Sequence, residues 1–417
     1  MPRKLTDWIT SYIEYTDNDE PALIFRTWAA VSAIASALQR KCFIRWSGKL
    51  YPNMYIILIG PSGKARKGTA MKPALSIMQE IGITIAANDL TRQALVQTMM
   101  EISQTPPIIK PGGAPILHAS LTIFSKELNV FLGFQNLELI ANLCDWYDCD
   151  DVWEYRTVGR QQEKVEGVWV NLFAATTPEG FEKSLPKDMI GSGLTSRMVF
   201  VYDDKAGIVW DPFNVKYDPK LKDHLTADLR SIMTMQGQFI PTDAFLYTRY
   251  KDWYINTRKN PPFKDPKFAG YNMRRADHLL KLSVVMSASR SDTMKIDATD
   301  FDRAKTLLEL TERRMPRAFA GVGDYVLAGA IERVAASVML QGSLKFNDLF
   351  SIHYHDLSKE DLNNVILSLE TLGRVKVTGN TIHYIGGEED GQTESVSEVR
   401  EKQDPSEVEG DASVQKT

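Results

Sequence analysis

Residues 54–70, MYIILIGPSGKARKGTA, constrain the fold more than any other part of the chain. The segment begins with a continuous run of large apolar side chains, which predicts a strand buried on both faces. A loop with two glycines follows, and the pattern over residues 68–81 is helical. A buried strand, a glycine loop and a helix in this order are typical of α/β folds with a parallel sheet.

The residues that follow continue this alternation of helices and strands. We predict helices near residues 91–103 and 128–143, and strands at residues 121–124 and over VWVNLFAAT. Between the second helix and the second strand, YDCDDVWEYRTVGR has the polar pattern of a hairpin. The alternation predicts a parallel sheet flanked by helices.

The chain of 417 residues is longer than one hydrophobic core usually serves. We divide it into an N-terminal helical segment (1–45), an α/β core (46–215), a helical lid or linker region (216–322), a C-terminal domain (323–385) and an acidic tail (386–417). In the C-terminal domain three helical patterns precede two strands around a TGN turn, which predicts a winged helix.

The glycine loop has features of a phosphate-binding loop. Such loops aim backbone N–H groups at phosphates, place a lysine beside them and offer a Ser or Thr hydroxyl to Mg²⁺. The usual spacing is G-x-x-x-x-G-K-[ST], but here Ala65 and Arg66 stand at the second glycine and the lysine. One inserted residue puts Lys67 in the lysine role, with Lys64 as the competing choice. A basic glycine turn that binds no nucleotide is the other interpretation.

Candidate nucleotide contacts lie in this loop and at the end of a later strand. Thr69 is the first residue after Lys67 that carries a hydroxyl group. Thr176 and Thr177 stand at the tip of the next predicted strand, where enzymes that hydrolyse ATP at a phosphate-binding loop place a polar residue that senses the γ-phosphate. We expect ATP to contact the following residues: Gly60, Pro61, Ser62, Gly63, Lys64, Arg66, Lys67, Gly68, Thr69, Thr176 and Thr177.

Two charged residues complete the expected catalytic set with Lys67. Glu127 follows the LTIF strand, where a carboxylate positions the attacking water or, with Thr69, holds Mg²⁺. Its alternative is a solvated surface glutamate. Arg197 directly precedes the strand MVFVY and is suited to bind phosphate oxygens, although a structural salt bridge is the alternative. We also consider a second phosphate sensor among Arg274, Arg275 and Lys281.

Together these segments resemble the AAA+/RecA-like P-loop ATPases of phage and mobile-element replication proteins. The similarity is greatest to a YfjI-like ATPase family of undefined function, often fused to primase-polymerase modules. It rests on GPSGKARKGTA, LTIFSKEL and GLTSR and covers about residues 20–310. Many members end the loop with Arg-Lys-Ser or Arg-Lys-Gly, which resembles Arg66, Lys67 and Gly68. The extra loop residue and Gly68, in place of a hydroxyl residue, depart from the usual pattern.

The resemblance implies an ATP-dependent DNA helicase or translocase of phage or mobile-element replication. It would work as a ring, expected to be a hexamer, with ATP at subunit interfaces and Arg197 reaching the neighbour's nucleotide. The alternative is a replication initiator or helicase loader that assembles on DNA without unwinding it. A scaffold with a degenerate site is the third possibility.

The charge distribution permits a polyanionic partner. The net charge is −4, but residues 386–417 hold ten acidic and three basic residues, or −7, which leaves −4 + 7 = +3 for residues 1–385. Basic side chains among aromatics suit single-stranded DNA, and the predicted hairpin offers Arg156, Arg160 and Lys164. A charge-laced surface hairpin is an equal alternative.

The tail lacks aromatic residues, so we expect it to be disordered. It would act as a solubilising segment, or as an acidic segment that docks a partner or competes with nucleic acid. The third helix of the winged helix is acidic, which favours a protein partner for that domain as well.

Three cysteines are too few for a disulfide framework, and we expect them to be reduced. The longest apolar run is too short to span a bilayer, and the first residues lack the apolar core of a signal peptide. We therefore expect no membrane partner and a cytoplasmic location, in a bacterial host if the protein is phage-encoded.

Overall fold

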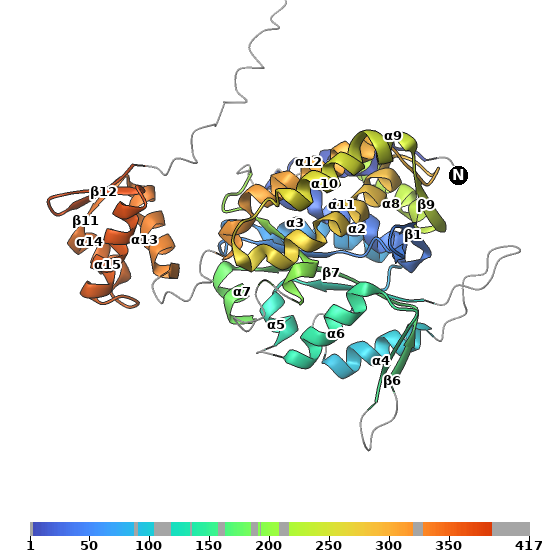
Figure 1. Ribbon diagram of the computed structural model, residues 1–417, viewed down its shortest axis with the longest axis horizontal. Coiled ribbons are helices and arrows are strands. Elements are labelled where there is room, and N and C mark those ends of the chain that lie inside the picture. The colour runs from blue at the N-terminus through green and yellow to red at the C-terminus, as the bar shows by residue number, and fades with distance from the viewer. Residues whose placement is uncertain are drawn as a thin grey trace, which may run out of the picture. The chain divides into compact units, whose positions relative to one another are not determined.

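The computed structural model describes residues 3–86, 91–103, 118–133, 136–156, 163–184, 191, 193–207, 217–319 and 328–385. The chain divides into two compact units, residues 1–322 and 323–417. The first unit is mixed α/β, with a parallel sheet flanked by helices, which confirms the fold class at that level (Figure 1). The expected segments 1–45, 46–215 and 216–322 all belong to this one unit.

The central sheet has four parallel strands in the order β4-β7-β3-β8. Every residue of β3, β4 and β7 is buried, which explains their nearly continuous apolar sequences. Ile85 adds a parallel bridge to Thr122 of β4. The strands are β3 (Tyr55–Ile59), β4 (Ala119–Ser125), β7 (Val168–Thr176) and β8 (Met198–Tyr202).

Helices cover both faces of this sheet (Figure 1). One side carries α2 (Leu23–Leu38), α3 (Lys67–Glu80), α8 (Pro219–Met233), α10 (Lys251–Lys259), α11 (Ala269–Arg290) and α12 (Ala298–Arg314). The other side carries α4 (Arg92–Ser103), α5 (Leu128–Leu132) and α6 (Leu137–Asp148). The remaining helices of this unit are α1 (Trp8–Tyr15), α7 (Pro178–Ser184) and α9 (Asp243–Phe245).

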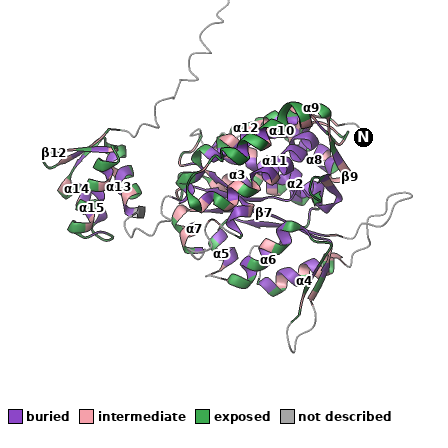
Figure 2. Cartoon of the chain, viewed as in Figure 1, coloured by how far each residue is buried: buried purple, intermediate pink, exposed green. Residues whose placement is uncertain are grey.

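Helix α2 lies at the centre of the first unit, and most of it is buried (Figure 2). Its small residues allow the sheet to approach closely, and its serines satisfy polar side chains of the buried strands. Asn171 of β7 donates to Ser36 at 3.1 Å, and Thr122 of β4 donates to the same hydroxyl at 3.0 Å. These bonds fix α2 to two strands without leaving the strand polar groups unpaired.

A second sheet has the strand order β10-β9-β1-β2. The predicted CFIRW strand is β1, and it pairs in parallel with β9 rather than joining the central sheet. Strand β9 comes from the predicted helical region, so residues 216–322 contribute strands as well as helices. The strands are β1 (Cys42–Arg45), β2 (Lys49–Leu50), β9 (Gly237–Pro241) and β10 (Lys295–Ile296).

The single helix expected at residues 128–143 is wrong, because α5 and α6 occupy this region. Gly133 follows α5 with φ +67°, a left-handed conformation that ends a helix. Asn136 then caps α6 by accepting a hydrogen bond from the Leu139 N–H at 3.1 Å. The glycine and the asparagine are both visible in the sequence, but the helical spacing of apolar residues continues on either side of them and predicts one helix.

The second unit contains three helices and an antiparallel sheet in the order β11-β13-β12. Ser358 and Asp361 form a capping box at the start of α15, and Gly373 follows its end with φ +67°. The elements are α13 (Ala328–Gln341), β11 (Ser343–Lys345), α14 (Phe346–His353), α15 (Lys359–Thr371), β12 (Val375–Thr378) and β13 (Thr381–Tyr384). The unit has its own apolar core, which includes Val334, Val338, Leu349, Leu362, Val365 and Leu369.

Two expectations about the whole chain can be compared with the structure. No disulfide joins any two of Cys42, Cys144 and Cys149, all of which lie in the described ranges. None of the helices in the described ranges combines the length and the apolar character needed to cross a bilayer. The acidic tail lies outside the described residues.

Candidate functional site

The loop between β3 and α3 lies at the carboxyl edge of the central sheet. Gly60 begins it and has no room for a side chain, because a Cβ there would lie 2.2 Å from the Asp203 carbonyl oxygen and 2.8 Å from Ala65 Cβ. Gly63 has φ +74°, which favours glycine. The Asp203 N–H also donates to the Ile59 carbonyl at 3.1 Å. The loop therefore starts in contact with the end of β8.

Lys67 is the first residue of α3, and its side chain turns back over the loop. The Lys67 Nζ donates to the carbonyl oxygens of Gly60 at 2.6 Å and Pro61 at 3.3 Å. Burial lowers the pKa of Lys67, and the charges of Glu127 and Glu179 oppose this shift. Lys67 therefore lies inside the site, within the electrostatic reach of Glu127.

Lys64, the competing lysine, is exposed, and its side chain has no polar partner among the described residues. Ser62 and Arg66 are exposed too, and Arg66 forms an ion pair with Glu20 at 2.7 Å. The structure thus turns the guanidinium of Arg66 toward the start of α2 and leaves Lys67 as the cation over the loop carbonyls.

The first turn of α3 has backbone donors available. Arg66 precedes the helix in a left-handed conformation with φ 50°, and its carbonyl accepts from the N–H groups of Thr69 and Ala70. The N–H groups of Lys67 and Gly68 have no acceptor within the described part of the chain. A Cβ on Gly68 would meet nothing within 4 Å, so nothing packs against the helix on the side of Gly68.

Polar residues end two neighbouring strands at this edge. Thr176 is the last residue of β7 and pairs with Ile59 of β3. It is 1% exposed and donates to the Thr177 carbonyl at 3.3 Å. The Thr177 hydroxyl accepts from the Gly180 N–H at 3.0 Å and so fixes the start of α7. Glu127 follows β4 as the exposed residue that precedes α5.

Asp203 and Arg314 belong to the same edge, but the sequence analysis missed both. Asp203 follows β8, is 7% exposed and accepts a hydrogen bond from Arg314 Nη1 at 2.6 Å. Arg314 ends α12, and half of its side chain is exposed. No local sequence signal links two residues that are 111 positions apart. The helical region therefore brings a cation next to the start of the glycine loop.

A groove of about 710 Å³ opens beside Asp203, between α2 and α12. Leu23, Leu307 and Leu310 provide apolar wall, and the charged residues of the lining are Asp203, Asp302, Arg303 and Arg314. Mostly apolar walls with a few polar groups are usual for sites that bind small organic molecules.

The three cations considered as a second phosphate sensor lie away from this edge of the sheet or are bound to other groups of the protein. Arg275 is buried and binds both carboxylate oxygens of Glu312, at 2.6 and 2.7 Å. Lys281 is buried and donates to the carbonyl and side-chain oxygens of Asn53, two residues before β3 begins. Burial lowers the pKa of Lys281 to about 8. Arg274 forms an ion pair with Asp148 at 3.2 Å.

Arg197 lies at the amino edge of the sheet, because it directly precedes β8. Its Nη2 donates to Asp148 at 2.6 Å, its guanidinium lies 6.0 Å from the Tyr147 ring centre, and its side chain is 13% exposed. Asp148 is shared with Arg274. Within one chain, Arg197 therefore forms the salt bridge that was its alternative interpretation, at the opposite end of the sheet from the glycine loop.

The hairpin proposed to grip DNA consists of β5 (Val152–Tyr155) and β6 (Glu163–Glu166). Its exposed cations are paired with its own glutamates: Arg156 with Glu154 at 3.3 Å and Lys164 with Glu166 at 2.8 Å. Arg160 lies outside the described residues. These pairs are the pattern expected of a charge-laced surface hairpin.

No group of three or more His, Cys, Asp or Glu side chains forms a metal site in the described ranges. Mg²⁺ bound with a nucleotide commonly takes only one or two protein ligands, with water and phosphate as the others, so Thr69 and Glu127 remain the predicted pair. No protein-family model matches the chain, and no curated protein matches it at a significant level. The functional argument therefore depends on the geometry of the site.

Proposed function

We propose that the chain is an ATP-dependent DNA helicase or translocase that binds ATP and Mg²⁺ at the β3–α3 loop. One observation carries this proposal: Lys67 Nζ lies on the carbonyls of Gly60 and Pro61, within the electrostatic reach of Glu127, in a loop that leads into a helix whose first N–H groups have no acceptor among the described residues. A lysine, helix N–H groups and a carboxylate at one sheet edge are the groups that phosphoryl transfer requires.

The strand order supports a P-loop core. Strand β3 is flanked by β7 on one side and β8 on the other, and all of them run in parallel. Ligands of open α/β sheets bind beyond the carboxyl ends of the strands, where the strand order reverses. The glycine loop is at this position, since the chain leaves β3 for the β4–β7 side and later returns to β8.

In this proposal each residue has a defined task. Lys67 exchanges its two carbonyl partners for phosphate oxygens, and the N–H groups of Lys67 and Gly68 donate to the same phosphates. Thr69 and Glu127 would hold Mg²⁺, which would supply positive charge next to the phosphates. Glu127 also orients the attacking water, and Thr176 contacts the γ-phosphate from β7.

The groove between α2 and α12 is the proposed place of the nucleoside. Its apolar wall suits a base, and Arg314 lies on the side of Asp203, which contacts the start of the loop. Arg314 thereby replaces Arg274, Arg275 and Lys281 as the candidate second phosphate sensor.

The C-terminal unit is proposed to be a winged helix that binds a replication partner. Its three helices and the β12–β13 hairpin support this assignment. The first turn of α15 carries Glu360 and Asp361, which would repel the DNA backbone. Leu367 and Leu372 at its far end are 63% and 61% exposed, which suits contact with a protein.

A replication initiator or helicase loader is the second candidate. Two observations favour it: Gly68 stands where a hydroxyl usually binds Mg²⁺, and the hairpin cations Arg156 and Lys164 are neutralised by neighbouring glutamates. Weak hydrolysis and assembly on DNA without unwinding would distinguish a loader from a motor. Both candidates are proposed to act in the cytoplasm.

The test is ATP hydrolysis with and without single-stranded DNA, followed by strand separation. We expect DNA to raise the turnover of the wild type, and Lys67→Ala to abolish it. Arg197→Ala should also abolish turnover but retain ATP binding, and a mixture with Lys67→Ala should recover activity because each chain supplies what the other lacks. If the wild type neither binds nor hydrolyses ATP with DNA present, the proposal fails.

A further inference from the structure

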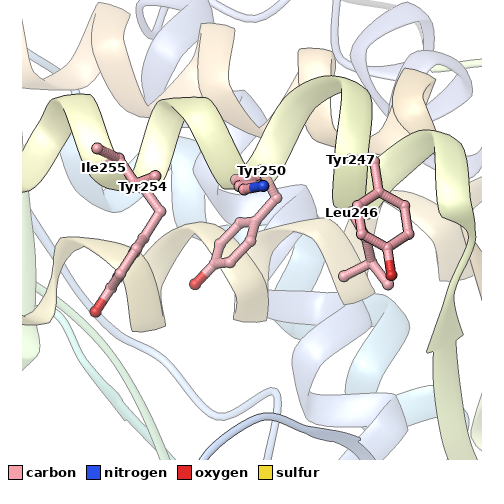
Figure 3. A pocket seen from close by; sticks show the side chains of 6 residues that line it. Leu246, Tyr247, Tyr250, Tyr254 and Ile255 are labelled. Carbon is pink, nitrogen blue, oxygen red and sulfur yellow. The ribbon is translucent and has the colours of Figure 1, made fainter.

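A row of aromatic rings follows one side of the helical segment that contains α10. The segment begins with a π-helical turn, Leu246–Tyr250, and continues directly into α10. Figure 3 shows the rings of Tyr247, Tyr250 and Tyr254 beside one another on the same side of this segment. They line a shallow groove of about 380 Å³ together with Leu246, Lys251 and Ile255.

The row continues beyond the helix to the turn between β1 and β2. The ring of Trp46 meets the ring of Tyr254 edge-on, with 6.2 Å between their centres. Tyr254 stacks on Tyr250 at 5.7 Å, and Tyr250 stacks on the buried Phe245 at 5.8 Å. The middle rings are therefore held by the core, whereas the end rings Tyr247 and Trp46 remain 67% and 40% exposed.

This exposure has a cost and a structural origin. Large exposed rings in one continuous row lose the free energy that burial would give, and such patches on soluble proteins usually mark binding surfaces. The π-helical turn adds a residue relative to an α-helix and so changes the direction of the side chains that follow. Turns of this type occur often at functional sites.

Cations without a carboxylate partner belong to the segments that carry the row. Lys251 lies in the groove, and the guanidinium of Arg258 lies 5.2 Å from the Tyr254 ring centre. Lys259 follows at the end of α10, and Arg45 and Lys49 stand on either side of the Trp46 turn. None of these five cations forms an ion pair within the described ranges of the chain.

The nearest acidic residues reduce this positive charge only in part. Asp252 is exposed on α10, and Asp302 of α12 is already bound to Arg249 at 3.0 Å. Asp277 of α11 lies within electrostatic reach of Arg258 and Tyr250, but it also forms an ion pair with Arg274 at 3.7 Å. Residues 245–260 contain four basic residues and one acidic residue, or 4 − 1 = +3. By contrast, the cations of the β5–β6 hairpin are paired with its own glutamates.

We propose that this row is a binding surface for single-stranded nucleic acid, with bases stacked on Tyr247 and Trp46 and phosphates bound by Lys251, Arg258 and Lys259. Helical rise separates Tyr247 from Tyr254 by about 10 Å, so the row spans a few nucleotides. The inference rests on the proposed function, since a motor on DNA must hold its strand. It places the DNA-binding surface on α10 instead of on the β5–β6 hairpin.

Single strands fit this surface better than duplex DNA does. Bases are accessible for stacking only when they are unpaired, and stacking on rings tolerates any sequence. Tyr and Trp offer no base-specific fork of hydrogen bonds, which duplex readout needs. Lys251 in the groove and Arg258 beside Tyr254 suit a phosphate backbone that follows the groove.

The experiment measures anisotropy of a labelled oligothymidylate with the full chain, without nucleotide and with EDTA, so that ATP hydrolysis plays no part. Tyr247→Ala and Trp46→Ala should each weaken binding by about 5- to 140-fold, the range for one base stacked on an aromatic ring. Tyr247→Phe keeps the ring and should bind as the wild type does. Tyr354→Ala, at a 55% exposed tyrosine of the other unit, is the matched control.

A salt titration separates stacking from charge. Lys251→Ala should reduce the slope of log K against log salt by about 0.7, the value for one phosphate of a single strand. Tyr247→Ala should leave that slope unchanged. Melting temperatures of the Tyr247 and Lys251 variants should match the wild type, because these side chains are exposed, whereas Trp46→Ala also loses the edge contact with Tyr254 and should melt at a lower temperature.

Several results would overturn the inference. One is equal binding by wild type, Tyr247→Ala and Trp46→Ala; another is a preference for duplex over single strand. Binding of phosphatidylserine vesicles instead of the oligonucleotide would make the row a lipid surface. Loss of self-association with unchanged oligonucleotide binding would make it a contact between copies. A wild type that binds the oligonucleotide but neither binds nor hydrolyses ATP would refute only the ATPase proposal, so the two failures are distinguishable.

Discussion

Replacement of Lys67 by alanine is the sharpest test of the phosphate loop. The Nζ group makes two hydrogen bonds, 2.6 and 3.3 Å long, to loop carbonyls that a bound phosphate would replace. Loss of one preorganised donor to the developing charge of a transition state typically costs about 10²- to 10³-fold in kcat, or about 2.7–4 kcal/mol. We expect Lys67→Ala to lose turnover by at least this factor.

The same change should affect folding little. Lys67 is half-buried with a lowered pKa, so its charge is not optimally solvated, and alanine is a good residue for the first turn of a helix. We expect a stability change of about 1 kcal/mol or less. Lys64→Ala is the matched control, since Lys64 is an exposed lysine of the same loop. It should change turnover by less than about threefold.

The assay combines phosphate release, binding of a fluorescent ATP analogue and a urea unfolding curve for each variant. If Lys64→Ala loses turnover and Lys67→Ala keeps it, the inserted-residue register is wrong and Lys64 is the phosphate ligand. If the wild type hydrolyses ATP and both variants do so at the same rate, the reaction takes place elsewhere. If Lys67→Ala unfolds at a lower urea concentration, the reasoning about its burial is refuted.

Three further predictions concern stability. Gly60→Ala should destabilise the chain by about 1–3 kcal/mol in urea unfolding, because its Cβ would lie 2.2 Å from the Asp203 carbonyl; an unchanged midpoint would contradict this geometry. Arg275→Ala leaves the Glu312 carboxylate buried and unpaired, so we expect a loss of about 3–5 kcal/mol, measured against the wild type at pH 7. Burial lowers the pKa of His278 to about 3, so the unfolded chain binds a proton below pH 6.5 that the folded chain does not. The free energy of unfolding should therefore decrease as the pH is lowered from about 6.5 to about 3, by about 1.4 kcal/mol per pH unit for this residue. His278→Gln should remove this contribution to the pH dependence of the urea midpoint.

The central sheet was predictable from the sequence because its signals are local. Strands β3 and β7 are apolar runs with turn residues at both ends, and such runs can only be buried. Strand β1 has a similar local pattern, yet its partner β9 lies almost 200 positions away. A single sequence shows that a strand forms but not which strand it pairs with, so the second sheet was not foreseen.

The candidate site shows the same limit. Lys67 and Thr176 were identified because a loop and a strand end place them relative to residues close in sequence. The sequence could not decide among Arg274, Arg275 and Lys281, because helical periodicity places residues on a face but does not show toward which edge of the sheet they lie. The pairing of Arg314 with Asp203 depends on how α12 packs against β8, and only the folded chain reveals it.

The position of Arg197 makes assembly a geometric requirement of the proposed mechanism. Strand β8 runs parallel to β3, with Met198 opposite Tyr55. Arg197 therefore lies at the amino edge of the sheet, whereas the glycine loop lies at its carboxyl edge. Five residues at about 3.3 Å each separate the two edges by about 16 Å, farther than an arginine side chain extends. Arg197 therefore cannot reach a phosphate on the loop of its own chain while β8 stays in the sheet. If Arg197 contributes to hydrolysis, it does so on another copy, and it must first leave Asp148, which Arg274 also binds. Arg274 could then keep Asp148 paired, so that the exchange leaves the Asp148 carboxylate with a cation.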